Sequence, residues 1–377
     1  DHRDLHSFPT RRSSDLLWDP YSSCGFPFFA NPQAGTFYPI YLLVGRLFGG
    51  GYKVFVVLWL GHWFLALAGC FVLAKRLGFS PLAAFVASVS FGFSGFFLGH
   101  AEHTSFINAA AYVPWVIVLL DMACEKQLVY AFLSGAALGL AGLSGYPGIF
   151  WYSLVMTLLW APLRYGLTRK TVAVACIVAV VAGIVVSPTY VSFLMEGSGY
   201  TDRVGALDLK TACDSGRFPV SAMTSLLVPR FSVSFPEWID SDLSMTDGYF
   251  GLLGLAAVLV TVMYQPMRRR WKWLLIWMLI AWFFSLGTYG GIRVIGYYVV
   301  PVLRYTRHSA LFREFWILGG ALLAGVLLDR LLNASEQERE QIASLSIRTM
   351  ALILAGCACV LVWMALVPPY QESTVSG

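Results

Sequence analysis

The chain has 377 residues, of which 58% are hydrophobic and 12% are charged, and its formal net charge at pH 7 is +5. Soluble domains carry about 25% charged residues, so this composition excludes an ordinary soluble enzyme or binding module. Lysine and arginine gather on the cytoplasmic side of membrane proteins, so the positive charge gives no reason to expect a nucleic-acid partner. We expect an all-α polytopic membrane protein whose first partner is the lipid bilayer.

Residues 1–16 differ in character from the rest of the chain. They lack the apolar run of a signal peptide. They resemble the translation of a short-read sequencing adapter, so we set them aside when considering function. We expect the natural protein to begin further upstream with at least one more helix, and we expect the tail, residues 369–377, to be truncated.

The remaining chain alternates apolar segments with polar loops. Residues 17–52 hold four prolines and several aromatic residues, which predicts an extended outer loop that leads into an interfacial helix. Six apolar segments then occupy residues 53–194, two occupy 248–287 and two occupy 315–368. A bilayer span needs roughly 20 mostly apolar residues, so we expect about ten transmembrane helices. Two large outer loops separate them, an acidic one at 195–247 and a basic one at 288–314.

Lysine and arginine in the short connections set the predicted orientation, because these residues stay on the cytoplasmic side during insertion. The short loops assigned to the outside, near residues 99–105 and 145–147, contain none. We therefore expect a multi-pass protein of the bacterial cytoplasmic (inner) membrane, with its active face outward. The cations that support this orientation are Lys75, Arg76, Lys126, Arg164, Arg169, Lys170, Arg268, Arg269, Arg270, Lys272, Arg330, Arg339 and Arg348.

The first candidate group lies in the proline-rich segment of residues 17–43. Asp19, Asn31, Gln33 and Tyr38 could line a pocket for a polar headgroup or a sugar at the membrane surface. The alternative is that the aromatic residues of this segment only anchor the chain at the level of the lipid headgroups.

The second candidate group is His100, Glu102 and His103, three ionisable side chains in one short outer turn. Histidine and glutamate can act as a general base with an orienting partner, or bind a divalent metal. Their spacing matches no structural zinc pattern, so a metal is a weak hypothesis and the cofactor stays unknown. A plain polar turn is the alternative.

The third candidate group is basic and lies in the second outer loop. Arg304, Arg307 and Arg313 lie there against the positive-inside bias, and Arg203 of the first outer loop could join them. Guanidinium groups bind phosphate oxygens in a bidentate manner, which suits a lipid-linked phosphate. These arginines could instead pair with the acidic outer loop. A disulfide between Cys24 and Cys213, the two cysteines expected in outer loops, is a further hypothesis.

The order of the motifs along the chain resembles the YfhO family of bacterial membrane proteins. The matching stretches are WDPY, GFPFFANPQAGTFYP, GHAEH, SPTYVSFLMEGSGYTDR, SLGTYGG and VVPVLRYTRHSALFRE. That family looks related to the GT-C membrane glycosyltransferases, so the resemblance implies a GT-C-like fold.

The resemblance also implies a reaction. A sugar would pass from a polyprenyl-phosphate carrier to a cell-envelope polymer or lipid acceptor. An acidic residue of the first outer loop would serve the acceptor. In such enzymes it follows the first helix, which would place it upstream of Leu17, and Asp19 is the carboxylate that remains in the present segment. Glu102 and His103 would be further catalytic candidates, and the arginines would stabilise the departing phosphate.

Two other functions remain open at the level of the sequence. A transporter or flippase for lipid-linked sugars would use the same outer pocket without making a bond, although the predicted spans hold few ionisable residues besides His62. A non-catalytic membrane scaffold that binds a partner through its outer loops is the third hypothesis.

Overall fold

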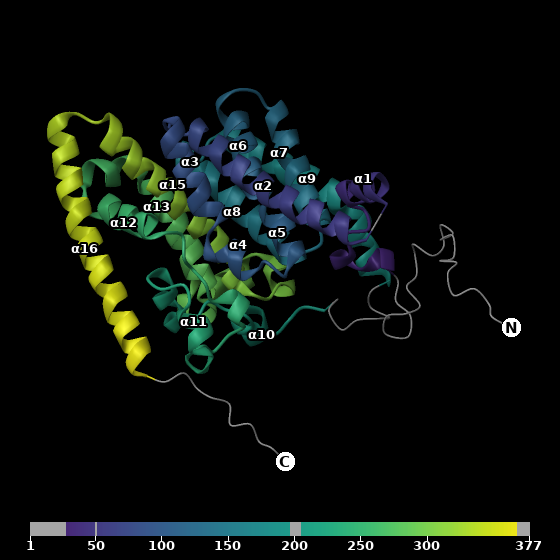
Figure 1. Cartoon of the computed structure of the whole chain (residues 1–377). Helices are drawn as coiled ribbons and strands as arrows, with labels where there is room; N and C mark the ends of the chain where they lie inside the picture. Colours follow the sequence, from purple (N-terminus) through teal and green to yellow (C-terminus); the bar gives the residue numbers. More distant parts are fainter. Residues whose placement is uncertain (1–27, 50, 197–204, 368–377) are drawn as a thin grey trace, which may run out of the picture.

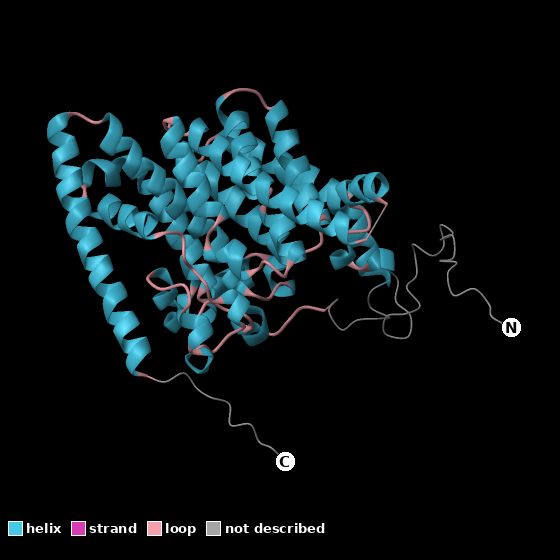
Figure 2. Cartoon of the chain, viewed as in Figure 1, coloured by secondary structure: helices cyan, strands magenta, loops and turns pink. Residues whose placement is uncertain are grey.

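The structure is a computed structural model that describes residues 28–49, 51–196 and 205–367. Within these residues the regular structure is entirely helical (Figure 2). Long helices form a bundle, and short helices and loops gather at one end of it (Figure 1). The predicted all-α class is confirmed. Asp19, Cys24 and Arg203, which the sequence singled out, lie outside the described residues.

Within the part of the chain that the structure describes, the bundle is made of thirteen main helices, and those of the first half of the chain, up to α9, are joined by short connections. They are α1 (Pro39–Phe48), α2 (Tyr52–Arg76), α3 (Pro81–Gly92), α4 (Gly95–Gly99), α5 (Thr104–Ala110), α6 (Val113–Glu125), α7 (Val129–Leu143), α8 (Pro147–Tyr165), α9 (Arg169–Glu196), α12 (Leu252–Met263), α13 (Gln265–Ser285), α15 (Arg313–Asn333) and α16 (Glu336–Leu366). Several begin with proline in the first turn, where a missing N–H costs nothing, namely those that start near Pro39, Pro81, Pro114, Pro147 and Pro266.

Each of the ten apolar segments predicted from the sequence is helical in the structure. Six stretches of the described chain are long and apolar enough to cross a membrane. They are Tyr52–Arg76, Pro81–Gly99, Thr104–Glu125, Arg169–Glu196, Ser309–Asn333 and Glu336–Leu366. Helices α7 and α12 are apolar but shorter than a full span. The chain is thus a multi-pass membrane protein.

Burial separates the central helices from the peripheral ones. The apolar window of Thr104–Glu125 is 83% buried and that of Ser309–Asn333 is 72% buried, whereas the window of Glu336–Leu366 is only 11% buried. Helix α16 accordingly runs along the edge of the molecule beside α12 (Figure 1). Its exposed apolar surface is what a helix facing lipid requires.

Close packing of α7 on α9 depends on glycine. A Cβ atom at Gly135 would lie 2.7 Å from the Val181 Cβ, and one at Gly139 would lie closer still to Val185. Small residues let two membrane helices approach until their backbones and methyl groups make contact, which is the main attraction available inside lipid. The glycines spaced four apart on α7 therefore fix its distance from α9.

We expect Gly139→Leu to lower the free energy of unfolding by about 1–3 kcal/mol, because the new side chain forces α7 and α9 apart. Thermal unfolding of the purified protein in detergent measures the effect. Gly183→Leu on α9 is the matched control, since a Cβ there meets nothing within 4 Å. Equal losses for both variants would contradict this packing.

Candidate functional site

The end of the bundle that carries the candidate residues is covered by a loop layer, which we define as residues 205–251 and 286–312. It contains short helices joined by loops: α10 (Leu209–Asp214), η6 (Val220–Leu226), α11 (Phe231–Ser234), η7 (Pro236–Trp238), η8 (Leu243–Met245), η9 (Gly287–Gly290), α14 (Ile292–Val299), η10 (Pro301–Tyr305) and η11 (Ser309–Phe312). These elements lie together at the lower edge of the bundle in Figure 1. The sequence predicts that this layer faces outward.

A buried arginine holds the loop layer together. Arg293 of α14 is fully buried, and its guanidinium donates to three backbone carbonyls, those of Ala212 at 2.9 Å, Leu303 at 2.9 Å and Thr306 at 2.8 Å. These carbonyls come from both segments of the layer. Ser309 adds a link, since its hydroxyl lies 3.3 Å from Arg293 and donates to the Cys213 carbonyl.

A carboxylate provides a second link between the two segments. Asp214 accepts hydrogen bonds from the backbone N–H of Thr288 at 2.9 Å and from its hydroxyl at 2.8 Å. Arg217 pairs with Asp240 at 2.6 Å and stacks over the Tyr289 ring at 4.3 Å. The acidic first loop and the glycine-rich turn of the second loop are thereby joined.

We expect Arg293→Met to lower the free energy of unfolding by about 3 kcal/mol or more, because several buried carbonyls lose their donor at once. Limited proteolysis of the loop layer and thermal unfolding should both report the change. Lys210→Met, which removes an exposed cation of the same layer, should leave both readouts at the wild-type level. Proteolysis unchanged in Arg293→Met would contradict the role.

The candidate site centres on a contact between His100 and Arg313, both fully buried. His100 caps the C-terminus of α4, and Arg313 is the first residue of α15. Arg313 Nη2 lies 3.2 Å from His100 Nδ1 and donates to the Ser244 carbonyl. Two regions that the sequence treated as separate candidates, the histidine turn and the basic loop, therefore meet in one place.

The contact with Arg313 determines which ring nitrogen of His100 carries the proton. Its Nδ1 also lies 2.9 Å from the Phe96 carbonyl, and one nitrogen cannot accept from Arg313 and donate to Phe96 together. The charge-assisted bond is the stronger one, and Phe96 already accepts from the His100 backbone N–H. Nε2 then carries the proton, and this buried atom has no hydrogen-bond partner in the described part of the chain. Burial, together with nearby Arg313, lowers the pKa of His100, so it is neutral at pH 7.

Two aspartates of the first loop approach the same place. Burial raises the pKa of Asp247 to about 6, although the Tyr249 N–H and Arg313 oppose the rise. Burial also opposes ionisation of Asp242, but hydrogen bonds from Ser244 and the nearby histidines hold the pKa of Asp242 below its usual range. The site therefore holds one carboxyl group that stays ionised and one that titrates close to neutral pH.

Aromatic rings connect the histidine turn to the second loop. His103 stacks on Phe106 with centroids 5.1 Å apart, Phe106 packs on Tyr146 at 4.0 Å, and Tyr146 lies 6.4 Å from His308. His308 has φ 67° and ψ 59°, and it has the one positive φ among the described residues other than glycine. Strain of this kind gathers at functional sites because the surrounding structure must hold it.

We call the following six residues the loop-layer cluster: His100, His103, Asp242, Asp247, His308 and Arg313. His100 and Arg313 form the buried part of the cluster, whereas His103 is partly exposed and Asp242 is exposed. The Asp247 carboxyl group, with a pKa of about 6, can accept a proton near neutral pH. The buried guanidinium of Arg313 favours negative charge nearby.

Glu102 lies beside this cluster and not inside it. Its side chain is 80% exposed, and its carboxylate lies 3.7 Å from His103 Nδ1. Among the described residues, no group of three or more His, Cys, Asp or Glu side chains is arranged to hold a metal ion. His100, Glu102 and His103 therefore do not together form such a group.

The three predicted phosphate-binding arginines differ in how far their guanidinium groups are already engaged. Arg313 is buried, as described above. Arg304 donates to the backbone carbonyls of Tyr297 at 3.0 Å and Tyr298 at 3.2 Å. Arg307 is half-buried, and its guanidinium has no hydrogen bond or ion pair with any residue that the structure describes. Among the described contacts, Arg307 is thus the arginine of the three whose guanidinium is least engaged.

The predicted headgroup pocket of the first outer segment is not seen among its described residues. Tyr38 is fully buried, and its hydroxyl lies 2.6 Å from His62 Nε2 and 2.5 Å from the Tyr112 hydroxyl. The Asn31 side chain caps the short helix η3 (Pro32–Ala34) by accepting from the Gln33 N–H at 2.9 Å. Tyr38 therefore fastens the segment to the bundle, Asn31 stabilises a short helix within the segment, and Gln33 is exposed at the surface.

Cys213 is buried and is a free thiol among the described residues, and Cys24, its hypothesised disulfide partner, lies outside them. The sequence reasoning also missed several residues of the site. Asp242 and Asp247 could not be distinguished from the other acidic residues of their loop, Phe106 lay in an apolar segment, and Tyr146 lay in a short outer loop without charged residues. Arg293 could have been singled out from the sequence, because it is a cation in a predicted outer loop.

Glu314 is a further buried ionisable residue, next to Arg313 in the first turn of α15. It is fully buried, and neither carboxylate oxygen has a hydrogen-bond partner in the part of the chain that the structure describes. An ionisable side chain held at the end of a membrane helix is a functional candidate by default. It lies beneath the loop-layer cluster and adjoins it through Arg313.

The pKa of Asp247 predicts a pH dependence of stability. Because its pKa is about 6 in the folded protein and near 4 in an unfolded chain, folding favours the protonated form. Its contribution is fully present below about pH 4 and is lost as the pH rises through about 6. We expect the melting temperature of Asp247→Asn, relative to wild type, to rise between pH 5 and pH 7. A melting temperature that changes with pH in the same way for both proteins would contradict the raised pKa of Asp247.

Comparison with known proteins gives one weak likeness. No family model matches the chain, and no curated protein matches it. The chain is similar to the oligosaccharyltransferase of Archaeoglobus fulgidus, solved with a tethered acceptor peptide that contains the NVT sequon, at 14% sequence identity and a TM-score of 0.43. The match covers 94% of this chain and 49% of that enzyme, so the chain spans about half the length of the enzyme. A likeness at this level assigns neither a family nor a substrate.

Proposed function

We propose that the chain is a membrane glycosyltransferase-like protein that transfers a sugar from a polyprenyl-phosphate carrier to a cell-envelope polymer or lipid. The observation that carries the proposal is the loop-layer cluster, in which His100, Asp247 and Arg313 meet at one end of the membrane helices. A carrier whose tail lies in the bilayer presents its phosphate at this level. The distribution of Lys and Arg supports an outward orientation of the loop layer in a bacterial cytoplasmic membrane.

In the proposed reaction, the acceptor oxygen forms a bond to C1 of the sugar while the bond from C1 to the phosphate oxygen breaks. The electron pair of the broken bond leaves with the phosphate, and the proton of the acceptor goes to a base. Asp247 and His103 are the candidates for that base, since both reach the partly exposed side of the cluster. A pKa near 6 leaves Asp247 largely ionised at pH 7, as a base requires.

The departing phosphate needs positive charge beside it. We assign that role first to Arg307, whose guanidinium makes no hydrogen bond or ion pair with the described residues. Tyr152 positions this segment, because its hydroxyl donates to the Arg307 carbonyl at 2.7 Å. Arg304 and Arg313 act through their existing contacts, Arg304 by shaping the loop and Arg313 by orienting His100. Asp19 and Arg203 are further candidates from the sequence.

The test is release of labelled sugar from a panel of polyprenyl-phosphate donors by the full-length protein in membranes. We expect Arg307→Gln to lower the transfer rate about tenfold to a hundredfold, the loss typical of one charge-assisted contact. Asp247→Asn should lower the rate at least as much, and Asp19→Asn tests the acidic residue of the first outer segment. Arg230→Gln is the matched control, since it removes an exposed cation of the loop layer outside the cluster.

Three results would count against the proposal. Transfer that is unaffected by Arg307→Gln and Asp247→Asn would remove the cluster from the reaction. Movement of the carrier across the membrane without transfer would favour a flippase. Neither activity, with the protein correctly inserted and the loop layer resistant to protease, would favour a scaffold.

A further inference from the structure

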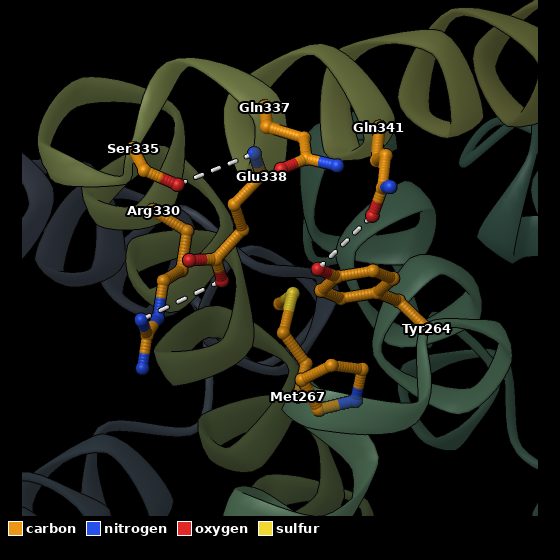
Figure 3. Close-up of a pocket in the computed structure, with 8 residues that line it drawn as sticks. Tyr264, Met267, Arg330, Ser335, Gln337, Glu338 and Gln341 are labelled. Atoms are coloured by element: carbon orange, nitrogen blue, oxygen red, sulfur yellow. Dashed lines mark hydrogen bonds and ion pairs between the residues drawn. The ribbon is translucent and has the colours of Figure 1, made fainter.

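A cavity opens at the end of the molecule opposite the loop layer. It has a volume of about 460 Å³ and lies where the start of α13, the end of α15 and the start of α16 meet. Figure 3 shows its lining, with the Met267 side chain between the Arg330–Glu338 pair and the Tyr264 ring. Met267 is buried and forms part of the wall, whereas Arg330 and Glu338 are partly exposed.

The position of the cavity separates it from the candidate site. Arg313 lies in the first turn of α15 and Arg330 lies in the last, so the helix places them about 25 Å apart at about 1.5 Å per residue. The apolar stretch of α15 ends at this cavity, and that of α16 begins beyond its polar first turns. The cavity is therefore at the level where membrane helices pass from hydrocarbon to headgroups.

The polar groups in the cavity are only loosely engaged with one another. The ion pair between Arg330 and Glu338 measures 3.7 Å, and the Tyr264 hydroxyl lies 3.5 Å from Gln341 Oε1. Ser335, which caps α16, accepts from the Glu338 N–H at 3.4 Å. Contacts of this length are near the limit of a hydrogen bond or ion pair, so a ligand can replace them at little cost.

Exposed basic residues lie close in sequence to the residues that line the cavity, together with the exposed acidic residues Glu336 and Glu340 of α16. Arg269 and Arg270 follow Pro266 of the lining in the first turns of α13, and Arg339 lies one residue beyond Glu338 on α16. All three side chains are exposed. Basic residues at the membrane surface attract anionic lipid headgroups, and pockets between membrane helices on the cytoplasmic side bind them.

We infer that this cavity binds the phosphodiester headgroup of an anionic phospholipid. Arg330 turns from Glu338 to the phosphate oxygens, and the hydroxyl and amide groups of Tyr264, Gln337 and Gln341 contact the remaining polar part of the headgroup. Its acyl chains extend along the exposed apolar surface of α16. The inference does not depend on the reaction proposed for the loop layer.

The experiment measures binding of phosphatidylglycerol to the purified full chain in neutral detergent by native mass spectrometry, with phosphatidylcholine as the neutral lipid. We expect phosphatidylglycerol to bind more tightly than phosphatidylcholine. Arg330→Gln should weaken phosphatidylglycerol binding about tenfold, whereas Glu338→Gln should tighten it, since it removes the competing anion. The opposite changes in affinity distinguish a binding role from a loss of folding, because misfolding would weaken phosphatidylglycerol binding by both variants.

Arg348→Gln is the matched control, because it removes an exposed cation of α16 about 15 Å along the helix from Glu338. Its affinity for phosphatidylglycerol should equal that of wild type. Equal affinity for the two lipids, or equal weakening by Arg330→Gln and Arg348→Gln, would overturn the inference. Inorganic phosphate or glycerophosphate that displaces the lipid at matched concentration would overturn the assignment to a lipid, because the cavity would then be a site for free phosphate.

Discussion

The arrangement of the loop layer depends on the buried guanidinium of Arg293. Short helices and irregular loops leave many backbone carbonyls without partners, and each costs free energy when it is buried unsatisfied. Arg293 supplies donors to carbonyls from both segments of the layer, and Ser309 extends the same link to Cys213. Because the Arg293 side chain donates hydrogen bonds to several carbonyls, the loops can be irregular and still keep one conformation. The candidate site is built on this frame.

The loop-layer cluster shows how burial and charge together tune a site. His100 remains neutral because it is buried beside a cation, while burial moves the pKa of Asp247 up towards neutral pH. Asp242 is exposed and receives hydrogen bonds from Ser244, so it stays ionised. The two carboxyl groups thus differ in pKa because their surroundings differ.

Helix α15 connects two regions of different chemistry. Its first turn carries Arg313 and Glu314, which are buried under the loop layer, and its last turn carries Arg330, which is partly exposed at the rim of a polar cavity. The helix between them is almost entirely buried, which makes it a rigid element of the bundle. The two ends therefore lie about 25 Å apart and carry separate groups of polar residues.

The sequence by itself determined that the chain is helical and crosses a membrane, because long apolar segments leave a backbone no other way to satisfy its hydrogen bonds in lipid. It also pointed to His103 and Arg307 as ionisable residues in polar turns. Only the tertiary structure decided that His100 and Arg313, more than two hundred residues apart, are in contact, that Tyr38 is buried in the bundle, and that Asp247 joins the cluster. The physical reason is that loop positions follow from long-range contacts such as those of Arg293, which leave no periodic pattern in the sequence.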